Sequence, residues 1–477
     1  MKVSDFKAVF TLPVIIGLMV FAMVMWPWVV LNDSDTWWHV TAGDWIIAHH
    51  AVPHVDPFSL TYAGKPWTAH EWLSEVVMSL VFSLAQWRGL MLLTALACGI
   101  SAWLLAREAA RSLKGLPLWL TVLGGLTLAG PHLLARPHIF VTPLMVLWFA
   151  GLLRARDDNR APAWWLLGVM LVWANMHGSF IIGLAMVCPF ALEALLDAGP
   201  TERMGVVVRW GGFGLAALLV SLFTPFGIDG LLFPIKLILM PGVTGIQEWS
   251  PLELNKPQPL SVAVLALMIV WWRQKPRIGI IRGLVLLGLL YMSLSSQRHE
   301  LILGMMAVLV LARPLGAAFG QTIGAPPPAG HRLAALAPVG IVLVLAMVRL
   351  VVPLEEPINA KNPYAAIRSL PPALRAQPVF SDYMFGGYLI HAGIRPFVDS
   401  RADMYGPVFL NHYADISSGR PGDLAPTLRD YAITWTILKP RNPAVRAMDH
   451  MPGWHRLYTD DRAVIHVRDA DAVAAKP

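Results

Sequence analysis

The chain has 477 residues, of which 56% are hydrophobic and only 14% are charged, whereas soluble proteins carry about 25% charged residues. The charges are unevenly distributed, because residues 1–352 hold 40 of them and the much shorter stretch 353–477 holds 27. This composition excludes a soluble enzyme, a disordered chain and a disulfide-rich secreted domain. It predicts a polytopic membrane protein with a soluble C-terminal domain.

Apolar runs recur through residues 1–352 and predict about 11 transmembrane helices, in a range of roughly 10 to 13. The runs cover 8–31, 89–106, 117–135, 138–153, 162–176, 178–196, 208–224, 259–273, 278–296, 299–315 and 333–352. With the N-terminus in the cytoplasm, 16 of the 23 basic residues of this region fall in cytoplasmic loops, as the positive-inside rule requires. We therefore expect a multi-pass protein of the cytoplasmic (inner) membrane, with residues 353–477 on the periplasmic, or extracytoplasmic, side.

The segment Glu71–Trp87 is apolar enough to span, but a span here would move the basic clusters to the outer face. We therefore predict an interfacial or re-entrant helix, which belongs to a first outer loop at residues 32–88. The expected domains are a transmembrane domain at 1–352, which includes this loop, and an extracytoplasmic domain at 353–477.

The first outer loop opens with two carboxylates, Asp33 and Asp35, next to the membrane surface. A carboxylate at this place can orient an acceptor hydroxyl, act as a general base or bind a divalent cation. Alternatively, Ser34 or Asp35 caps an amphipathic helix at 36–50. The tryptophans of that helix, Trp37, Trp38 and Trp45, are typical of residues in the interfacial belt.

Other polar groups of the outer loops are candidates for contact with a substrate. Asp56 and Glu71 lie in the first loop, His177 lies between two spans, and Glu248 lies in a Pro-rich loop at 224–259 whose length is typical of a lid over a groove. These four residues are predicted to contact an acceptor or to line its groove. The alternatives are a packed polar link between helices for His177 and a salt bridge within the loop for Glu248.

The combined pattern resembles the GT-C superfamily of integral-membrane glycosyltransferases. It consists of an acidic residue after the first span, a Trp-rich helix, V-P-H-V-D-P-F-S at 52–59 and P-W-x-x-x-E-W-L at 66–73. Further matches to a bacterial group of such proteins are R-P-H at 136–138, W-A-N-M-H-G at 173–178, E-W-S-P at 248–251 and R-H at 298–299. The superfamily includes the oligosaccharyltransferase catalytic subunit and the protein O-mannosyltransferases, which use a sugar linked to polyprenyl phosphate.

The resemblance implies roles for individual residues. It places Asp35 at the superfamily's catalytic base or metal ligand, with Asp33 as the second acid and with Mg²⁺ or Mn²⁺ as an optional cofactor. A second D-x-D motif in a later loop is not evident in the sequence, so a metal is not an obligatory part of the expectation.

Two short polar turns are expected to bind the phosphate of the donor. Arg136 and His138 form one, and Arg298 and His299 form the other. Arginine binds phosphate bidentately, and histidine can donate a hydrogen bond to it. The alternative for Arg136 is an arginine at the end of a span that extends to the lipid headgroups.

The C-terminal stretch is predicted to be a small α/β domain. Strands are expected at 378–381, 396–400, 431–439 and 462–468. Asp399 and Arg401 form either a structural pair or an acceptor contact. The sequence contains no nucleotide-binding glycine motif and no zinc spacing, and the positive net charge lies in the membrane part, so no nucleic-acid partner is expected.

The expected function is that of a cell-envelope glycosyltransferase, a hexosyl- or pentosyltransferase. It would transfer a sugar from a polyprenyl-phosphate-linked donor to a glycan, lipid or protein acceptor on the outer face of the bilayer. The alternatives are a polysaccharide polymerase or ligase, and a flippase or transporter of lipid-linked saccharides. Transporters carry ionisable groups near the midplane of broken helices, whereas those groups here gather in outer loops.

Overall fold

The computed structural model describes residues 12–26, 30–240, 250–253 and 255–321, scattered positions between 340 and 352, and residues 362–469. Contacts divide the chain into two compact units. Unit 1 comprises residues 1–30, 88–238 and 243–354, and unit 2 comprises residues 31–87, 239–242 and 355–477. The first outer loop therefore groups with the C-terminal stretch and not with the apolar helices that surround it in the sequence.

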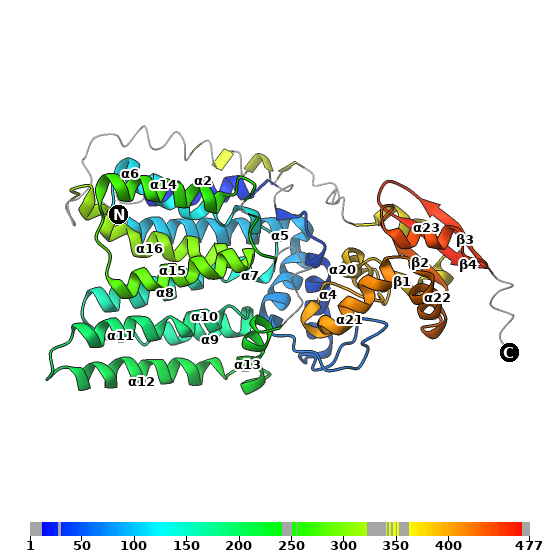
Figure 1. Ribbon diagram of the computed structural model, residues 1–477, viewed down its shortest axis with the longest axis horizontal. Helices are drawn as coiled ribbons and strands as arrows, with labels where there is room; N and C mark the ends of the chain where they lie inside the picture. Colours follow the sequence, from blue (N-terminus) through cyan, green and yellow to red (C-terminus); the bar gives the residue numbers. More distant parts are fainter. Residues whose placement is uncertain are drawn as a thin grey trace. The chain divides into compact units, whose positions relative to one another are not determined.

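Unit 1 is helical (Figure 1), and most of its helices lie in the predicted apolar runs. They are α2 (Leu12–Val24), the C-terminal part of α5 (Trp72–Ala109), α6 (Gly115–Thr127), η1 (Gly130–His132), α7 (Pro137–Phe140), α8 (Thr142–Asp157), α9 (Leu166–Met176), α10 (Phe180–Ala185), α11 (Val187–Asp197), α12 (Arg203–Ser221), α13 (Gly227–Ile238), α14 (Pro259–Gln274), α15 (Ile280–Ser295), η4 (Gln297–His299) and α16 (Glu300–Ala318). Helix α13 is an exception, because it lies in the stretch 224–259 that was expected to be an irregular loop.

Four helical stretches of the described residues are long and apolar enough to cross a membrane: Trp72–Ala109, Phe180–Asp197, Arg203–Ser221 and Gln297–Ala318. Five shorter apolar helices, α2, α6, α9, α14 and α15, lie in other predicted runs. The last predicted run, 333–352, lies largely outside the described residues. The molecule is thus helical with several apolar candidate spans, and the expected number of 11 stays a prediction.

Helix α16 packs against α6, α8, α14 and α15, which Figure 1 labels. Its crossing with α6 is close, because Gly125 and Gly304 face each other. A Cβ atom on either glycine would collide with the other's carbonyl oxygen. Small residues at such a crossing let two helix backbones approach, which is how apolar helices associate without a hydrophobic driving force.

Helix α5 belongs to both units, and its helical geometry is interrupted at Gln86, where φ is 50° and ψ is −142°. A positive φ is uncommon for a residue other than glycine. The interruption lies at the end of the predicted interfacial segment, 71–87, just before the predicted span, 89–106. The N-terminal part of α5 belongs to unit 2, and the remainder from Arg88 belongs to unit 1.

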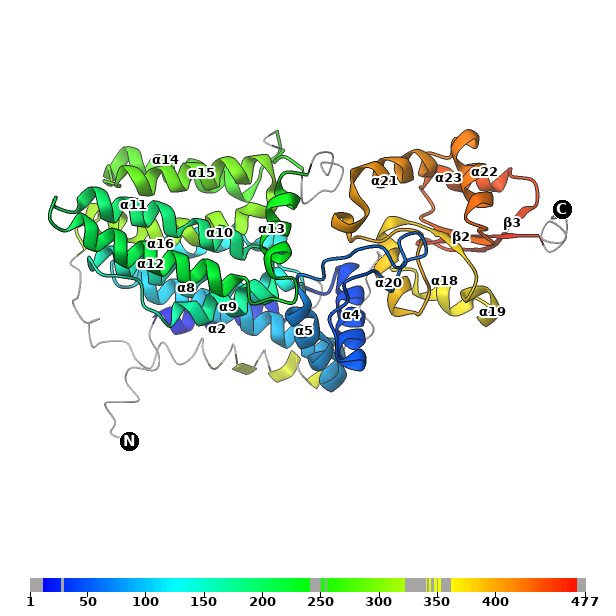
Figure 2. The ribbon, with the colours of Figure 1, turned by 90° about the horizontal axis from the view of Figure 1, so that it is seen from below.

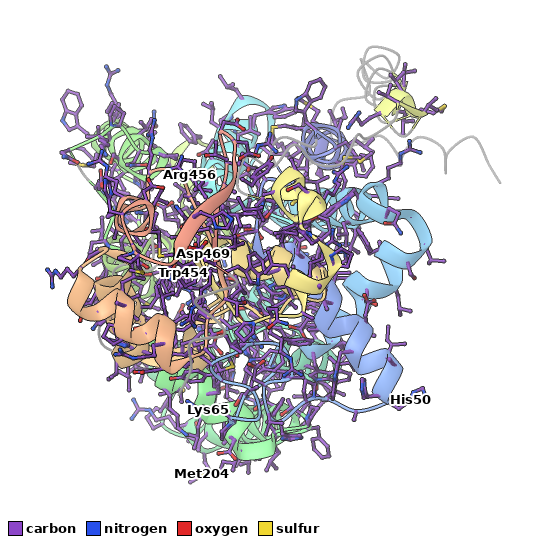
Figure 3. The ribbon with its side chains drawn as sticks, turned by 90° about the vertical axis from the view of Figure 1, so that its right-hand side faces the viewer. His50, Lys65, Met204, Trp454, Arg456 and Asp469 are labelled. Atoms are coloured by element: carbon purple, nitrogen blue, oxygen red, sulfur yellow. The ribbon has the colours of Figure 1, made fainter. Side chains whose placement is uncertain are left out.

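The C-terminal stretch folds around a four-stranded sheet with the order β1-β2-β4-β3. Strand β1 (Val379–Ser381) runs parallel to β2 (Trp435–Leu438), whereas β4 (Val464–Arg468) is antiparallel to both β2 and β3 (Trp454–Thr459). Figure 3 labels Trp454 and Arg456 on β3, with Asp469 beside Trp454 where the two last strands meet. The predicted α/β character is confirmed.

Helices cover both faces of this sheet (Figure 2). One core contains Phe380, Leu424 and Leu438, and the other contains Val379, Ile367 and Ile437. Alternate residues of each strand enter opposite cores, as expected for a sheet covered on both sides. The helices are α18 (Tyr364–Ser369), α19 (Pro372–Arg375), η5 (Tyr383–Phe385), α20 (Gly386–His391), α21 (Ala402–Ser417), α22 (Pro421–Asp430) and α23 (Pro443–Asp449).

Three of the four expected strands are present, but residues 396–400 form none. Their backbone carbonyls bond instead to the first outer loop, because Pro396 accepts from the Leu60 amide at 2.9 Å and Phe397 accepts from the Thr61 hydroxyl at 2.7 Å. The segment was expected to pair within the C-terminal sheet, and its partner is a loop more than 300 residues away in the sequence.

Candidate functional site

Helix α4 (Asp35–His49) lies within unit 2, where it packs against α20. Gly387 makes the contact possible, since a Cβ atom there would collide with the carbonyl oxygen of Ser34. Trp37 and Trp38 are 5% and 7% exposed, and the Trp38 indole donates to the Ser400 hydroxyl at 3.1 Å. The assignment of these two tryptophans to a lipid-facing belt was wrong, because they fill the contact between the first outer loop and the C-terminal stretch.

The two acids at the start of α4 are buried, Asp33 at 2% and Asp35 at 9% exposed. Asp33 Oδ2 accepts from the Thr36 amide at 3.2 Å and from the Thr36 hydroxyl at 3.3 Å, so Asp33 caps the first turn. Asp35 Oδ1 accepts from the Ser34 hydroxyl at 3.2 Å. Ser34 is the N-cap residue of α4, as one of the two alternatives predicted, but its side chain makes no capping hydrogen bond and Asp33 supplies that bond instead. Asp35 is the first residue of a helix whose dipole favours a carboxylate there.

Asp56 belongs to a buried charge network with Arg401. The Arg401 Nη1 donates to Asp56 Oδ1 at 2.8 Å, while Nε and Nη2 donate to the two oxygens of Asp399 at 2.9 and 2.7 Å. Tyr405 donates to Asp399 Oδ2 at 2.9 Å. The predicted Asp399–Arg401 pair is therefore present, and Asp56, which was predicted at an acceptor groove, joins it.

Electrostatics favour the ionised forms of Asp56 and Arg401. Burial opposes ionisation of Asp56, but the charge of Arg401 and hydrogen bonds from Ser59 and Phe58 outweigh burial and hold the pKa of Asp56 below its usual value. Burial would likewise lower the pKa of Arg401, but Asp399 and Asp56 raise it well above the usual value. The network has four satisfied carboxylate oxygens, which is typical of a structural role.

A second buried cluster joins α4 to the start of α5. His39 Nδ1 lies 3.3 Å from Glu75 Oε1 and 3.9 Å from Glu71 Oε2. The exposed fractions of His39 and Glu75 are 3% and 1%. Of these three residues the sequence analysis named only Glu71 as a groove residue. Packing of α4 on α5 creates the cluster, and no local spacing in the sequence links His39 to Glu75.

These two sets of acids differ in how well they suit a metal ion. Among the described residues, His39, Glu71 and Glu75 are the group of three or more ligating side chains whose ligand atoms lie within 4.8 Å of one another. Asp33 and Asp35 are not part of such a group, and Asp33 is engaged as a helix cap. The metal role of the two aspartates stays a prediction, and we derive no step through a metal held by them.

Unit 1 brings the two predicted phosphate-binding turns together. His138 Nε2 lies 2.9 Å from the His132 carbonyl oxygen, and this contact joins α7 to η1. His132 Nε2 lies 3.6 Å from Glu300 Oε2, and this contact joins η1 to α16. Arg136 immediately precedes α7, and Arg298 with His299 lies in η4 immediately before α16. His132 and Glu300 were not predicted as site residues, yet they link the two turns.

His177 ends α9 in the same unit. Its ring lies 6.2 Å from that of His138, and its Nδ1 lies 2.8 Å from the Ser179 hydroxyl. His299 Nδ1 lies 3.3 Å from the Met292 carbonyl oxygen. Glu248 lies outside the described residues. The predicted residues are thus divided, with Asp33, Asp35, Asp56 and Glu71 in unit 2 and the basic turns in unit 1.

No protein-family model matches the chain, and no curated protein matches it significantly. Among solved structures, the chain is similar to the oligosaccharyltransferase of Archaeoglobus fulgidus, which was crystallised tethered to an acceptor peptide containing the NVT sequon. The TM-score is 0.51 at 12% sequence identity, and the match covers 91% of this chain and 69% of that one. At this identity the similarity establishes the fold alone, which is like that of the oligosaccharyltransferase. Membership of the GT-C superfamily stays a prediction.

Proposed function

We propose that the chain is a membrane glycosyltransferase that moves a sugar from a polyprenyl-phosphate-linked donor to an acceptor on the outer face of the membrane. The observation that carries the proposal is the match of 91% of the chain to the fold of an oligosaccharyltransferase. Two further features support it. One is an acidic residue, Asp35, at the start of α4, the first helix after the first span. The other is the pair of adjoining basic turns in unit 1.

In the proposed reaction, the acceptor's oxygen or nitrogen attacks the anomeric carbon, and the bond from that carbon to the phosphate oxygen breaks. Asp35, assisted by Asp33, takes the proton of the acceptor as general base. Negative charge develops on the leaving polyprenyl phosphate. Arg298, His299, Arg136 and His138 stabilise this charge, as preorganised donors do in other transferases.

The proposed setting is the cytoplasmic membrane, with the C-terminal α/β stretch extracytoplasmic. The distribution of basic residues supports this orientation. The acceptor class is a glycan, lipid or protein, and Glu71, His177 and Glu248 are proposed to contact it. The sugar that is transferred, a hexose or a pentose, is the one that the donor carries.

The test is transfer of labelled sugar by the purified full-length chain in liposomes that contain candidate polyprenyl-phosphate sugars and mixed acceptors. We expect Asp35→Asn to abolish transfer, and Asp44→Asn, the same change on the same helix, to retain it, because an asparagine can still accept the bond from Ser79. Full activity of Asp35→Asn would refute the assignment of the base. Translocation of the donor without a labelled product would refute transfer in favour of a flippase.

A further inference from the structure

The carboxylate of Glu75 is buried and only partly paired. Its side chain is 1% exposed, one oxygen faces His39 Nδ1 at 3.3 Å, and the other, Oε2, is buried and has no hydrogen-bond partner within the part of the chain that the structure describes. A buried carboxylate oxygen without a partner costs free energy. A proton or a cation must therefore complete this site.

The backbone fixes the three side chains in place. A Cβ atom on Gly43 would collide with the Glu75 carbonyl oxygen, so α4 and the start of α5 are in direct backbone contact there. His39 lies one turn before Gly43 on α4. Glu71 and Glu75 are likewise one turn apart and project to one side. All three side chains consequently face the same point between the two helices, within unit 2.

The distances suit a metal ion. Ligands that bind at about 2.1 Å with tetrahedral angles are separated by roughly 3.4 Å, and the two distances from His39 Nδ1 are 3.3 and 3.9 Å. His70 Nε2 lies 3.7 Å from the other oxygen of Glu71, and a partner of this kind orients a ligating carboxylate. One imidazole with two carboxylates favours a first-row transition metal over Mg²⁺ or Ca²⁺, which prefer oxygen ligands alone.

We propose that His39, Glu71 and Glu75 bind one divalent first-row transition-metal ion, and that Asp33 and Asp35 are not its ligands. The geometry of the cluster and the unpartnered oxygen of Glu75 carry this inference. It does not rest on the proposed transfer activity, because the readout is binding of the metal.

The experiment uses the full-length chain, stripped with a chelator and titrated with Mn²⁺ alone. We expect one bound Mn²⁺ per chain by electron paramagnetic resonance, with a nitrogen coupling from an imidazole in the pulsed spectrum. An oxygen-only site at Asp33 and Asp35 would give no such coupling. Glu75→Gln and Glu71→Gln should each weaken binding at least about tenfold, since even outer-shell partners contribute that much.

Asp33→Asn, Asp35→Asn and the matched control Asp44→Asn should bind Mn²⁺ as the unaltered chain does. Glu71 lies at the edge of the cluster, with its side chain 14% exposed, so the Glu71→Gln variant gives a result even if the change at Glu75 prevents folding. The proposal is overturned if the unaltered chain binds no Mn²⁺, if the nitrogen coupling is absent, or if binding survives the glutamate changes and is lost in Asp35→Asn.

Discussion

Two buried clusters of unit 2 each contain a pair of carboxylates, but they face different cations. Asp56 and Asp399 surround Arg401, whose side chain donates hydrogen bonds to both. Glu71 and Glu75 face His39, with His70 beside Glu71, and one Glu75 oxygen has no hydrogen-bond partner among the described residues. The arginine of the first cluster is a permanent cation and stabilises the structure. The histidines of the second cluster are cationic only when they are protonated, and this difference separates a structural site from a candidate ligand site.

The largest effect is expected from removing the cation of the first cluster. Arg401→Met leaves two carboxylates buried without their cation, which should cost about 3–5 kcal/mol of unfolding free energy. Thermal unfolding of the purified chain measures this loss. Arg446→Met, an exposed arginine of α23, serves as the control and should change little. An Arg401→Met variant as stable as the control would show that the network is not structural.

The next largest effect is expected from a substitution that pushes apart α4 and the start of α5, which together form the second cluster. In Gly43→Ala the new methyl group would collide with the Glu75 carbonyl oxygen, so α4 and α5 must move apart. We expect a loss of about 1–3 kcal/mol together with weaker binding of Mn²⁺. Gly422→Ala is the control, because a Cβ atom there meets open space. Unchanged binding of Mn²⁺ by Gly43→Ala would contradict the role of this contact.

A smaller effect on stability is expected when the pH is lowered. The pKa of folded Asp56 lies below the usual 3.8, so its contribution to stability is present above that value and is lost as the pH falls through the folded pKa. Unfolding of the unaltered chain compared with Asp56→Asn, from about pH 6 to about pH 3, should therefore show a stability difference that shrinks on acidification. A difference independent of pH would exclude an ionised Asp56 in the network.

The smallest effect concerns an exposed pair and provides a baseline for both clusters. Arg456 on β3 is paired with Asp449 at 2.6 Å at the surface. Exposed pairs contribute about 0.2–1 kcal/mol, so Arg456→Ala should lower the stability by no more than that in the same thermal assay. A loss as large as that in Arg401→Met would remove the distinction between buried and surface charge on which the comparison depends.

The sequence predicted what depends on local pattern. The apolar runs coincide with helices of unit 1, and the strands at β1, β2 and β4 and the Asp399–Arg401 pair are present. The strand β3 was missed because most of its residues are exposed, so its sequence has little alternation of apolar and polar residues. The two adjoining basic turns were identified as separate motifs, but their link through His132 and Glu300 could not be predicted from local pattern.

What could not be predicted depends on contacts between distant segments. Trp38 is read from the sequence as a lipid-facing residue, and only its bond to Ser400 shows that it is interior. Likewise, His39 and Glu75 are 36 residues apart, and a chain alone does not reveal which faces of two helices meet. The first difference arises from the grouping of the first outer loop with the C-terminal stretch, and the second arises from the packing of α4 on the start of α5 within that loop.

The bond between Asp56 and Arg401 also has a consequence for biogenesis. The two residues are 345 positions apart, and synthesis proceeds at about 5–20 residues per second. Asp56 is therefore made roughly 17–70 s before its partner. Throughout that interval the first outer loop lacks the arginine that its buried acid requires, so unit 2 can be completed only after the ribosome has reached the last quarter of the chain. Completion of this unit is therefore a late event in the synthesis of the chain.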